Sequence, residues 1–407
     1  MTRETQPFNA LKISDRIYWV GAIDWALRDF HGYSTNRGST YNSYLILADK
    51  ITLIDTVKKP FKDEFLSRIK SVVDPGDIDY VISGHAEMDH SGCLPEIIEI
   101  AKPEKVFAST KGVKALGEHF HTAYEITPVK DGETMSLGNM TLRFIETPML
   151  HWPESMFTYL ADEQVLFSQD AFGMHLASSE MFDDLIAEDV LRYEASKYYA
   201  NILLLYSPLV TKLLENVKGL GLPIRTIAAA HGPVWRKDLK RILDWYSKWA
   251  AQSFTNKAVI VYDTMWGSTA LMARAIGDGL ASEGVSVKTL PLGASDRSEV
   301  ALELLDAGAF LVGTSTLNNQ MLPRIADVLT YLKGLRPQNL IGVAFGSFGW
   351  GGEAVKQVSD ILKEMKVEVI GEGIKARFVP DNEALMKCHE FGAQMARELE
   401  ARCNIKT

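Results

Sequence analysis

The chain has 407 residues, of which 46% are hydrophobic and 23% charged, a composition typical of a folded globular protein with two or three domains. Its 43 basic and 52 acidic side chains give a net charge of -9, which disfavours nucleic acids and anionic membrane surfaces as partners. The N-terminal residues form no apolar leader, and no run approaches the roughly 18 apolar residues of a membrane span, so we expect a cytoplasmic protein.

The number and spacing of the cysteines make several kinds of site improbable. Cys93, Cys388 and Cys403 are scattered and form no C-x-x-C pair. This disfavours a disulfide scaffold, cysteine-ligated zinc and iron–sulfur clusters. Any metal ion must be held by other side chains.

Short apolar runs alternate with loops in the first half of the chain and predict strands. These runs cover residues 44–48, 51–55, 80–83, 141–146, 156–160 and 165–168. Helical spacing predicts helices over 61–73, 94–101 and 187–218, and the last is expected to break at Pro208.

The second half alternates regularly between strands and helices. The predicted strands are 258–263, 285–291, 309–313, 340–345 and 368–372, and the predicted helices are 270–283, 298–307, 325–335, 353–365 and 383–403. This alternation predicts a doubly wound parallel sheet with ligands at the carboxyl ends of its strands. The polar stretch at 250–256 marks the boundary between two predicted domains, 1–253 and 254–407.

Potential metal ligands gather where strands of the first half open into loops. The seven candidates are His85, Glu87, Asp89, His90, His151, Asp170 and His231. Imidazole combined with carboxylate suits iron, zinc or manganese, and seven donors are enough for two ions that share one carboxylate. Four further histidines, His119, His121, His175 and His389, are interpreted as structural or exposed.

The order H-x-E-x-D-H, followed by a distant His, Asp and His, resembles the metallo-β-lactamase superfamily. Zinc hydrolases of that superfamily carry His where this chain has Glu87. With Glu at this position the motif is similar to that of the flavodiiron proteins, which reduce dioxygen or nitric oxide at a non-haem di-iron site. The replacement of His by Glu has a physical explanation, because a harder anionic ligand favours ferric iron.

The resemblance implies an αββα sandwich and assigns the iron ligands. His85, Glu87 and His151 would hold one iron, Asp89, His90 and His231 the other, and Asp170 would bridge. It also suggests roles near the irons for His31 and Tyr33, and for one of Tyr198 and Tyr199. These two tyrosines differ by about 100° around a helix, so at most one is expected to face the irons and supply a proton.

A second set of loops predicts a flavin site. Strand 258–263 leads into Thr264, Met265, Trp266, Gly267, Ser268 and Thr269, a T-x-x-G-x-T loop similar to the phosphate loop of flavodoxins. The loop has neither G-x-G-x-x-G nor a Walker lysine, which favours a mononucleotide. Two later loops supply Ser315, Thr316, Leu317, Asn318 and Asn319, and Gly346, Ser347, Phe348, Gly349, Trp350 and Gly351. Together they indicate FMN.

The resemblance to flavodiiron proteins covers essentially the whole chain and implies how the halves cooperate. Two electrons from reduced FMN and two from a diferrous pair match the four that dioxygen needs to form water, whereas reducing two nitric oxide molecules to nitrous oxide needs two. Family members bring FMN and iron together in a head-to-tail homodimer, so we expect a dimer or tetramer. Electrons would come from rubredoxin or a reduced soluble carrier.

Two other functions stay open at this point. A zinc hydrolase fused to a flavodoxin-like domain would bind zinc, and would be expected to carry His at position 87. An electron-transfer flavoprotein with a decayed first domain would bind FMN but no metal.

Overall fold

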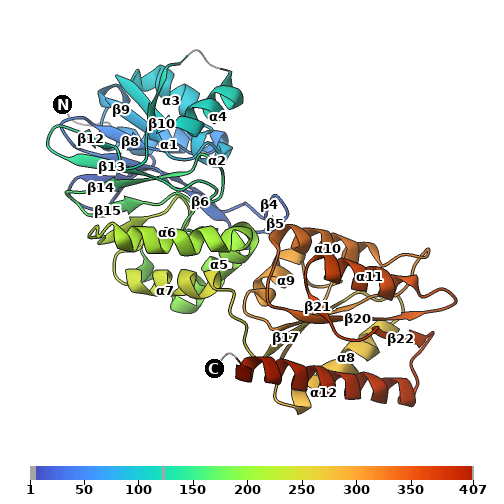
Figure 1. Cartoon of the computed structure of the whole chain (residues 1–407). Coiled ribbons are helices and arrows are strands. Elements are labelled where there is room, and N and C mark those ends of the chain that lie inside the picture. The colour runs from blue at the N-terminus through green and yellow to red at the C-terminus, as the bar shows by residue number, and fades with distance from the viewer. Residues whose placement is uncertain (1–5, 122–123, 406–407) are drawn as a thin grey trace. The chain divides into compact units, whose positions relative to one another are not determined.

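The computed structural model describes residues 6–121 and 124–405, and the chain forms two compact units (Figure 1). The first unit contains most of the chain up to Ser247. The second contains the chain from Lys248 onward together with His31–Ser34 and Tyr199–Ser207. The domain boundary between residues 253 and 254 stays a prediction.

Two stacked sheets form the centre of the first unit (Figure 1). The larger has the order β1 (Leu11–Lys12), β2 (Ile17–Trp19), β7 (Tyr44–Ile46), β8 (Thr52–Ile54), β9 (Tyr80–Ser83), β10 (Lys105–Ser109) and β11 (Ile126–Val129). The smaller has the order β12 (Thr134–Ser136), β13 (Thr141–Glu146), β14 (Met156–Leu160), β15 (Val165–Phe167) and β16 (Thr226–Ala228). Four further strands are short: β3 (Ala22–Asp24), β4 (Asp29–Phe30), β5 (Tyr33–Ser34) and β6 (Ser39–Tyr41).

Helices cover the outer faces of these sheets. Beside the larger sheet lie η1 (Lys59–Phe61), α1 (Lys62–Lys70), η2 (Pro75–Asp77), α2 (Met88–Ser91), α3 (Leu94–Ala101) and α4 (Thr110–Phe120). After the smaller sheet come η3 (Asp183–Leu185), α5 (Glu188–Tyr198), α6 (Ser207–Gly219) and α7 (Leu239–Ala250). This layering is the predicted αββα sandwich.

The alternation of side chains along each strand explains the layers, because successive residues of a strand point to opposite faces. Ile46, Ile54 and Ile82 are buried between the two sheets with Phe144 and Phe167 of the smaller one. Their neighbours Leu45, Leu53 and Val81 are buried instead against the helices, with Phe65, Ile97 and Leu116.

The predicted long helix over 187–218 is interrupted earlier than expected. α5 ends at Tyr198, a π-helical segment covers Tyr199–Leu203, and η5 (Leu204–Tyr206) precedes α6. The prediction of a break at Pro208 was therefore wrong. Pro208 lies in the first turn of α6, where its missing N–H breaks no helical hydrogen bond.

The second unit contains one parallel sheet, as predicted. Its order is β18 (Ser286–Pro291), β17 (Lys257–Tyr262), β19 (Ala309–Gly313), β20 (Ile341–Phe348) and β21 (Glu368–Val369), and β22 (Ile374–Arg377) also pairs with β20. The predicted strand 368–372 is thus shorter, and β22 was not predicted.

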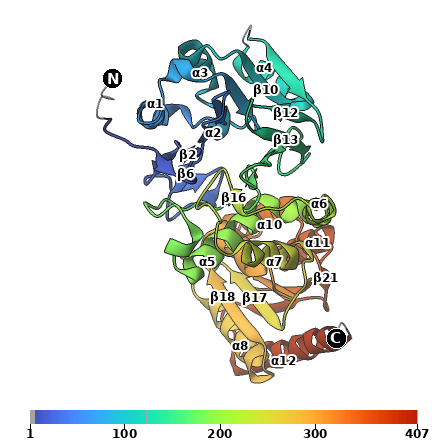
Figure 2. The same ribbon diagram turned by 90° about the vertical axis from the view of Figure 1, so that its left-hand side faces the viewer.

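Five helices cover both faces of this sheet. They are α8 (Ser268–Ser282), α9 (Arg297–Leu304), α10 (Pro323–Leu335), α11 (Glu353–Glu364) and α12 (Asn382–Ile405). α8 and α12 lie side by side on one face, as Figure 2 also shows, and α9, α10 and α11 cover the other. Ile260, Leu311 and Val343 of the sheet are buried against Met272 of α8 and Met395 of α12. No helix within residues 6–121 and 124–405 has both the length and the apolar composition needed to cross a bilayer.

Candidate metal centre and flavin pocket

All seven predicted metal ligands lie at or just beyond strand ends on one edge of the sandwich. His85 and Glu87 follow β9, and Asp89 and His90 lie in the short helix α2. His151, Asp170 and His231 follow β13, β15 and β16, which run in the same direction. The Met156 N–H donates to the Gly84 carbonyl oxygen, which joins this edge to the end of β9.

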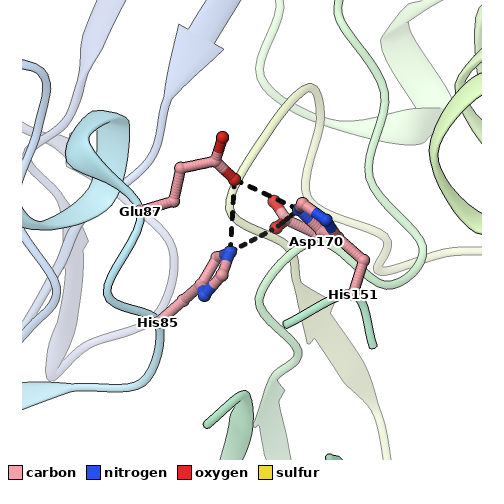
Figure 3. A group of neighbouring side chains, drawn as sticks. All are labelled: His85, Glu87, His151 and Asp170. Carbon is pink, nitrogen blue, oxygen red and sulfur yellow. Dashed lines mark ion pairs between the residues drawn. The ribbon is translucent and has the colours of Figure 1, made fainter. Parts of the chain in front are cut away.

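Four of the seven side chains form one group, drawn in Figure 3: His85, Glu87, His151 and Asp170. Their side chains point toward a common centre. The Nε2 atoms of His85 and His151 lie 3.4 Å and 3.1 Å from Oε2 of Glu87, and 3.3 Å and 3.2 Å from Oδ2 of Asp170. One donor atom of each residue lies within 4.8 Å of the others, which is close enough to surround a single metal ion.

The other three side chains, Asp89, His90 and His231, form a second group. Nε2 of His90 and Nε2 of His231 lie 3.2 Å and 3.4 Å from Oδ1 of Asp170. Asp170 therefore directs one carboxylate oxygen to each group. This is the geometry that a carboxylate shared by two ions requires.

Several polar atoms of this cluster are buried without a hydrogen-bond partner among residues 6–121 and 124–405. They are Nε2 of His85, Nε2 of His90, both carboxylate oxygens of Asp89 and both of Asp170. Buried polar atoms are nearly always hydrogen-bonded, so a concentration of exceptions indicates a bound group. Metal ions satisfy such atoms directly, and the residues present fit two of them.

Electrostatics in the cluster support the same conclusion. Burial opposes the charge of Asp170, but the imidazoles of His90, His151 and His85 hold its pKa well below the usual value. Burial likewise disfavours a charged Glu87, yet the neighbouring imidazoles of His151 and His85 lower its pKa to about 2. The carboxylates are therefore ionised, and the imidazoles of His85, His90 and His151, whose pKa values are raised, balance their charge. Metal ions can take over that role by displacing the imidazole protons.

Two groups behind the imidazoles were missed by sequence reasoning. Nδ1 of His85 lies 2.8 Å from Oε1 of Glu154, and Nδ1 of His231 lies 2.6 Å from the carbonyl oxygen of Thr40. Partners of this kind fix which ring nitrogen faces a metal. Glu154 follows His151 by three residues, and this proximity was the only signal in the sequence.

A buried carboxylate also ties two ligand loops together. Asp55 accepts hydrogen bonds from the backbone N–H of Gly84 at 2.8 Å and from Nε2 of Gln169 at 2.5 Å. Gly84 precedes His85, and Gln169 precedes Asp170. A Cβ atom on Gly84 would lie 2.1 Å from Nε2 of Gln169, so only glycine permits this approach.

The two adjacent tyrosines point to different places. The Tyr198 ring packs against His175 at 5.1 Å and lies 6.1 Å from the His231 ring. Burial, and then the charge of Asp170, raises the pKa of Tyr198 well above its usual value. Tyr199 instead packs against Trp249 at 5.4 Å, and its hydroxyl lies 3.0 Å from that of Ser207. Tyr198 is thus the tyrosine that faces the cluster.

The remaining histidines and the His31 segment differ in their surroundings. His175 is fully buried and its ring lies 4.8 Å from that of His231, whereas His119 and His121 are exposed and His389 is half-buried. His31 is exposed and Tyr33 is buried, and both belong to the segment that clusters with the second unit. A role for these two residues at the metal centre stays a prediction.

The three predicted flavin loops surround a cavity of about 760 Å³ in the second unit. The predicted residues that line it are Met265, Trp266, Ser268, Ser315, Thr316, Asn318, Asn319, Ser347, Phe348, Gly349, Trp350 and Gly351. Phe378 and Val379, which follow β22, also line it and were not predicted. Trp266 and Trp350 are 93% and 88% exposed, so both indoles stand at the rim, where they can flank a flat ring.

The other five predicted residues, Thr264, Gly267, Thr269, Leu317 and Gly346, support the loops from behind. The Thr269 hydroxyl lies 3.0 Å from that of Ser315 and 3.1 Å from that of Ser347, which links the three loops. Thr264 accepts a hydrogen bond from the Gly267 N–H. Leu317 exchanges backbone hydrogen bonds with Gln320. A Cβ atom on Gly346 would lie 1.8 Å from the Thr314 carbonyl oxygen, so glycine is required there.

The start of α8 fits a phosphate group. Gly267 precedes the helix with a φ of 89° and, as a glycine, provides no side-chain cap for its first N–H groups. A helix N-terminus of this kind binds anions through its backbone N–H groups and its dipole. The cavity therefore offers a phosphate site, polar loop atoms and aromatic surfaces, as FMN requires.

Comparisons with known proteins cover both halves of the chain. Residues 40–232 match the family described as "ODP family beta lactamase", and residues 260–392 match the family described as "Flavodoxin". A nitric oxide reductase of Moorella thermoacetica is 47% identical over 391 residues, which cover 95% of this chain and 98% of that relative.

Solved structures give the same picture. The rubredoxin oxygen:oxidoreductase of Desulfovibrio gigas matches with a TM-score of 0.95 and 44% identity, covering 97% of this chain and 100% of the other. The flavodiiron protein of Giardia intestinalis matches with a TM-score of 0.95 and 35% identity, covering 98% of this chain and 99% of the other. The similarity therefore extends over the complete two-unit architecture.

Proposed function

Since this chain belongs to the flavodiiron proteins, a family of oxidoreductases, we propose that it reduces dioxygen to water or nitric oxide to nitrous oxide at a pair of iron ions. The flavin loops of the second unit would hold FMN, which would relay electrons to the irons. The observation that carries this proposal is Asp170, which directs one oxygen to each of two ligand groups of the same composition.

The ligand groups define the two proposed iron positions. His85, Glu87 and His151 would hold one ion, Asp89, His90 and His231 would hold the other, and Asp170 would contribute one oxygen to each. Bound together, iron and FMN supply the electrons that the substrate takes up. Oxygen and nitrogen donors without cysteine suit iron in both of its common oxidation states.

The surrounding residues keep the centre dry and provide a proton. Five ligands, His85, Asp89, His90, Asp170 and His231, are each at most 4% exposed. Tyr198, itself 2% exposed, faces the centre and keeps its proton at neutral pH because burial raises its pKa. We assign to its hydroxyl the donation of a proton to the reduced substrate.

Electron supply requires a partner and a second copy of the chain. Relatives are named for rubredoxin, and the donor proposed here is rubredoxin or another reduced soluble carrier. Because the candidate iron ligands lie in the first unit and the flavin loops in the second, we propose that a head-to-tail homodimer, or a tetramer built from it, sets the FMN of one subunit against the irons of another.

Two measurements test the proposed function. Elemental and flavin analysis of the purified protein is expected to give two iron ions and one FMN per chain. Anaerobic reduction followed by separate exposure to dioxygen and nitric oxide is expected to oxidise the protein with at least one of them. Zinc without iron, accompanied by thioester or lactam hydrolysis, would instead support a hydrolase.

A further inference from the structure

The two proposed iron positions have the same set of direct ligands. Each has two imidazoles, one terminal carboxylate and one oxygen of Asp170. Direct ligation therefore gives the two positions equal formal charge. A difference in charge between them must therefore come from groups behind the ligands.

The groups behind the three most deeply buried histidines of the cluster do differ. Nδ1 of His85 faces the carboxylate of Glu154 at 2.8 Å, whereas Nδ1 of His231 faces the neutral backbone oxygen of Thr40 at 2.6 Å. Nδ1 of His90 is buried and has no hydrogen-bond partner in the part of the chain that the structure describes. Of these three imidazoles, His85 alone donates to an anion.

The position of Glu154 is fixed from several directions. The residue is 4% exposed, and the oxygen that faces His85 also accepts a hydrogen bond from the Ala86 N–H at 3.1 Å. Its backbone oxygen accepts a hydrogen bond from the Ser109 hydroxyl at 2.8 Å. Glu154 thus connects the loop that carries His85 to the loop that carries His151, and both histidines belong to the same ligand group.

A carboxylate in this place has two physical effects. It keeps the proton of the imidazole on Nδ1, so the lone pair of Nε2 points to the metal, and it raises the basicity of that ligand. Its negative charge is also poorly screened in a buried site, which favours the more highly charged state of a nearby metal ion.

We propose that Glu154 is a positioning residue that makes the two metal positions unequal, lowering the reduction potential of the ion held by His85, Glu87 and His151 relative to its neighbour. The inference rests on the proposed function in that both ions are taken to be iron. It assigns an order to their reduction: the ion bound by Asp89, His90 and His231 is reduced first.

The test compares Glu154→Gln with wild type and with Glu125→Gln, a matched loss of charge at an exposed glutamate of the same unit. Gln keeps the size and one acceptor oxygen but removes the charge. An anaerobic redox titration monitored by the paramagnetic mixed-valent signal measures both reduction steps without turnover. In Glu154→Gln the second reduction step, which belongs to the ion near His85, is expected to move to higher potential. The mixed-valent state should therefore exist over a narrower range of potentials.

Iron retention gives an independent readout. Glu154→Ala leaves Nδ1 of His85 without its acceptor and is expected to weaken iron binding by about 10- to 100-fold, the range found for such outer-shell partners. Chelator competition followed by iron analysis measures this. Normal FMN content in the same samples shows that the second unit remains folded.

Equal potentials in Glu154→Gln, Glu125→Gln and wild type would overturn the inference, and so would an equal shift of both steps. If Glu154→Gln loses FMN as well as iron, Glu154→Asp carries the test. Glu154→Asp keeps the negative charge but moves it away from His85, so its mixed-valent range should again be narrower than that of wild type. A range as wide as that of wild type would contradict the inference. A wild-type protein that binds no iron would instead refute the proposed function.

Discussion

Asp170 connects the two ligand groups, so its removal should affect both metal positions at once. Asp170→Ala deletes one oxygen donor from each position while leaving the flavin cavity untouched. We expect iron to fall well below two per chain while FMN stays near one, as measured by elemental analysis and flavin absorbance. Asp63→Ala, at a site whose side chain is 95% exposed, is the matched control and should retain both cofactors.

Glu87 distinguishes this centre from the zinc hydrolases that the motif resembles. Its pKa of about 2 keeps it anionic at neutral pH, where it offsets metal charge and favours iron. Glu87→His is therefore expected to bind zinc in place of iron when both are supplied, and to lose reductase activity. Retained iron and turnover in this variant would contradict the role assigned to Glu87.

Tyr198 and Tyr199 form a natural pair of test and control. Tyr198→Phe removes the hydroxyl of the tyrosine whose ring lies beside the cluster and is expected to lower turnover by roughly 10²-fold, a typical effect of losing a general acid. Tyr199→Phe removes a hydrogen bond to Ser207 and should cost about 1 kcal/mol of stability with little change in turnover. Stopped-flow reoxidation of both variants, at equal iron and FMN content, checks this. Equal rates would contradict the assignment to Tyr198.

Residues at strand ends were predictable from sequence, and their partners were not. His85, Asp170 and His231 each follow an apolar run, and this pattern predicts that they lie at a common edge of the sandwich. Glu154 contacts His85 across 69 residues of chain, and no local spacing reveals such a pair. The choice between Tyr198 and Tyr199 depends on the π-helical segment that begins at Tyr199, which the regular helical period does not contain.

At the scale of elements, an ion-pair network joins the edge of the parallel sheet in the second unit to helix α9. Oε2 of Glu303 in α9 lies 2.8 Å from Nζ of Lys257 at the start of β17, and its Oε1 lies 3.1 Å from Nζ of Lys288 in β18. Its side chain is 19% exposed. Burial raises the pKa of Glu303, but the hydrogen bond and charge of Lys257 outweigh it and hold that pKa below the usual 4.5.

This shift predicts a pH dependence of stability. Because its pKa is lower in the folded than in the unfolded chain, Glu303 stabilises the fold above about pH 4.5, and the contribution is lost as the pH falls through the folded pKa. Glu303→Gln should lower the free energy of unfolding by about 1–2 kcal/mol at pH 7. Urea titration of the full chain, monitored by flavin fluorescence, measures this difference in the free energy of unfolding. A loss that persists unchanged at pH 3 would contradict this origin.

Element types were predicted best where the period was regular. Every long helix and central strand of the second unit was predicted, because apolar residues recur there with one clear period. The missed β10 and α4 adjoin directly, with α4 beginning at Thr110 immediately after β10 ends at Ser109, so no loop separates their patterns. β21 has only two residues, too few to establish an alternation.

At the scale of the whole molecule, the residues of each candidate cofactor site belong to one unit. The seven metal ligands belong to the first unit and the residues that line the flavin cavity to the second. Both cofactors should therefore remain bound when subunits separate, whereas electron transfer between subunits should stop. Light scattering combined with activity at decreasing protein concentration is expected to show a fall in specific activity as monomers form. A fully active monomer would contradict the proposed dimer.

The spread of the metal ligands along the chain also sets an order during synthesis. All donors of the group formed by His85, Glu87, His151 and Asp170 exist once residue 170 has been translated, but the other group lacks His231 until 61 codons later. A nascent chain paused between these points carries one complete metal position and one incomplete position. The flavin loops are made later still. Translation therefore completes the donor set of one metal position first, that of the other position next and the flavin loops last.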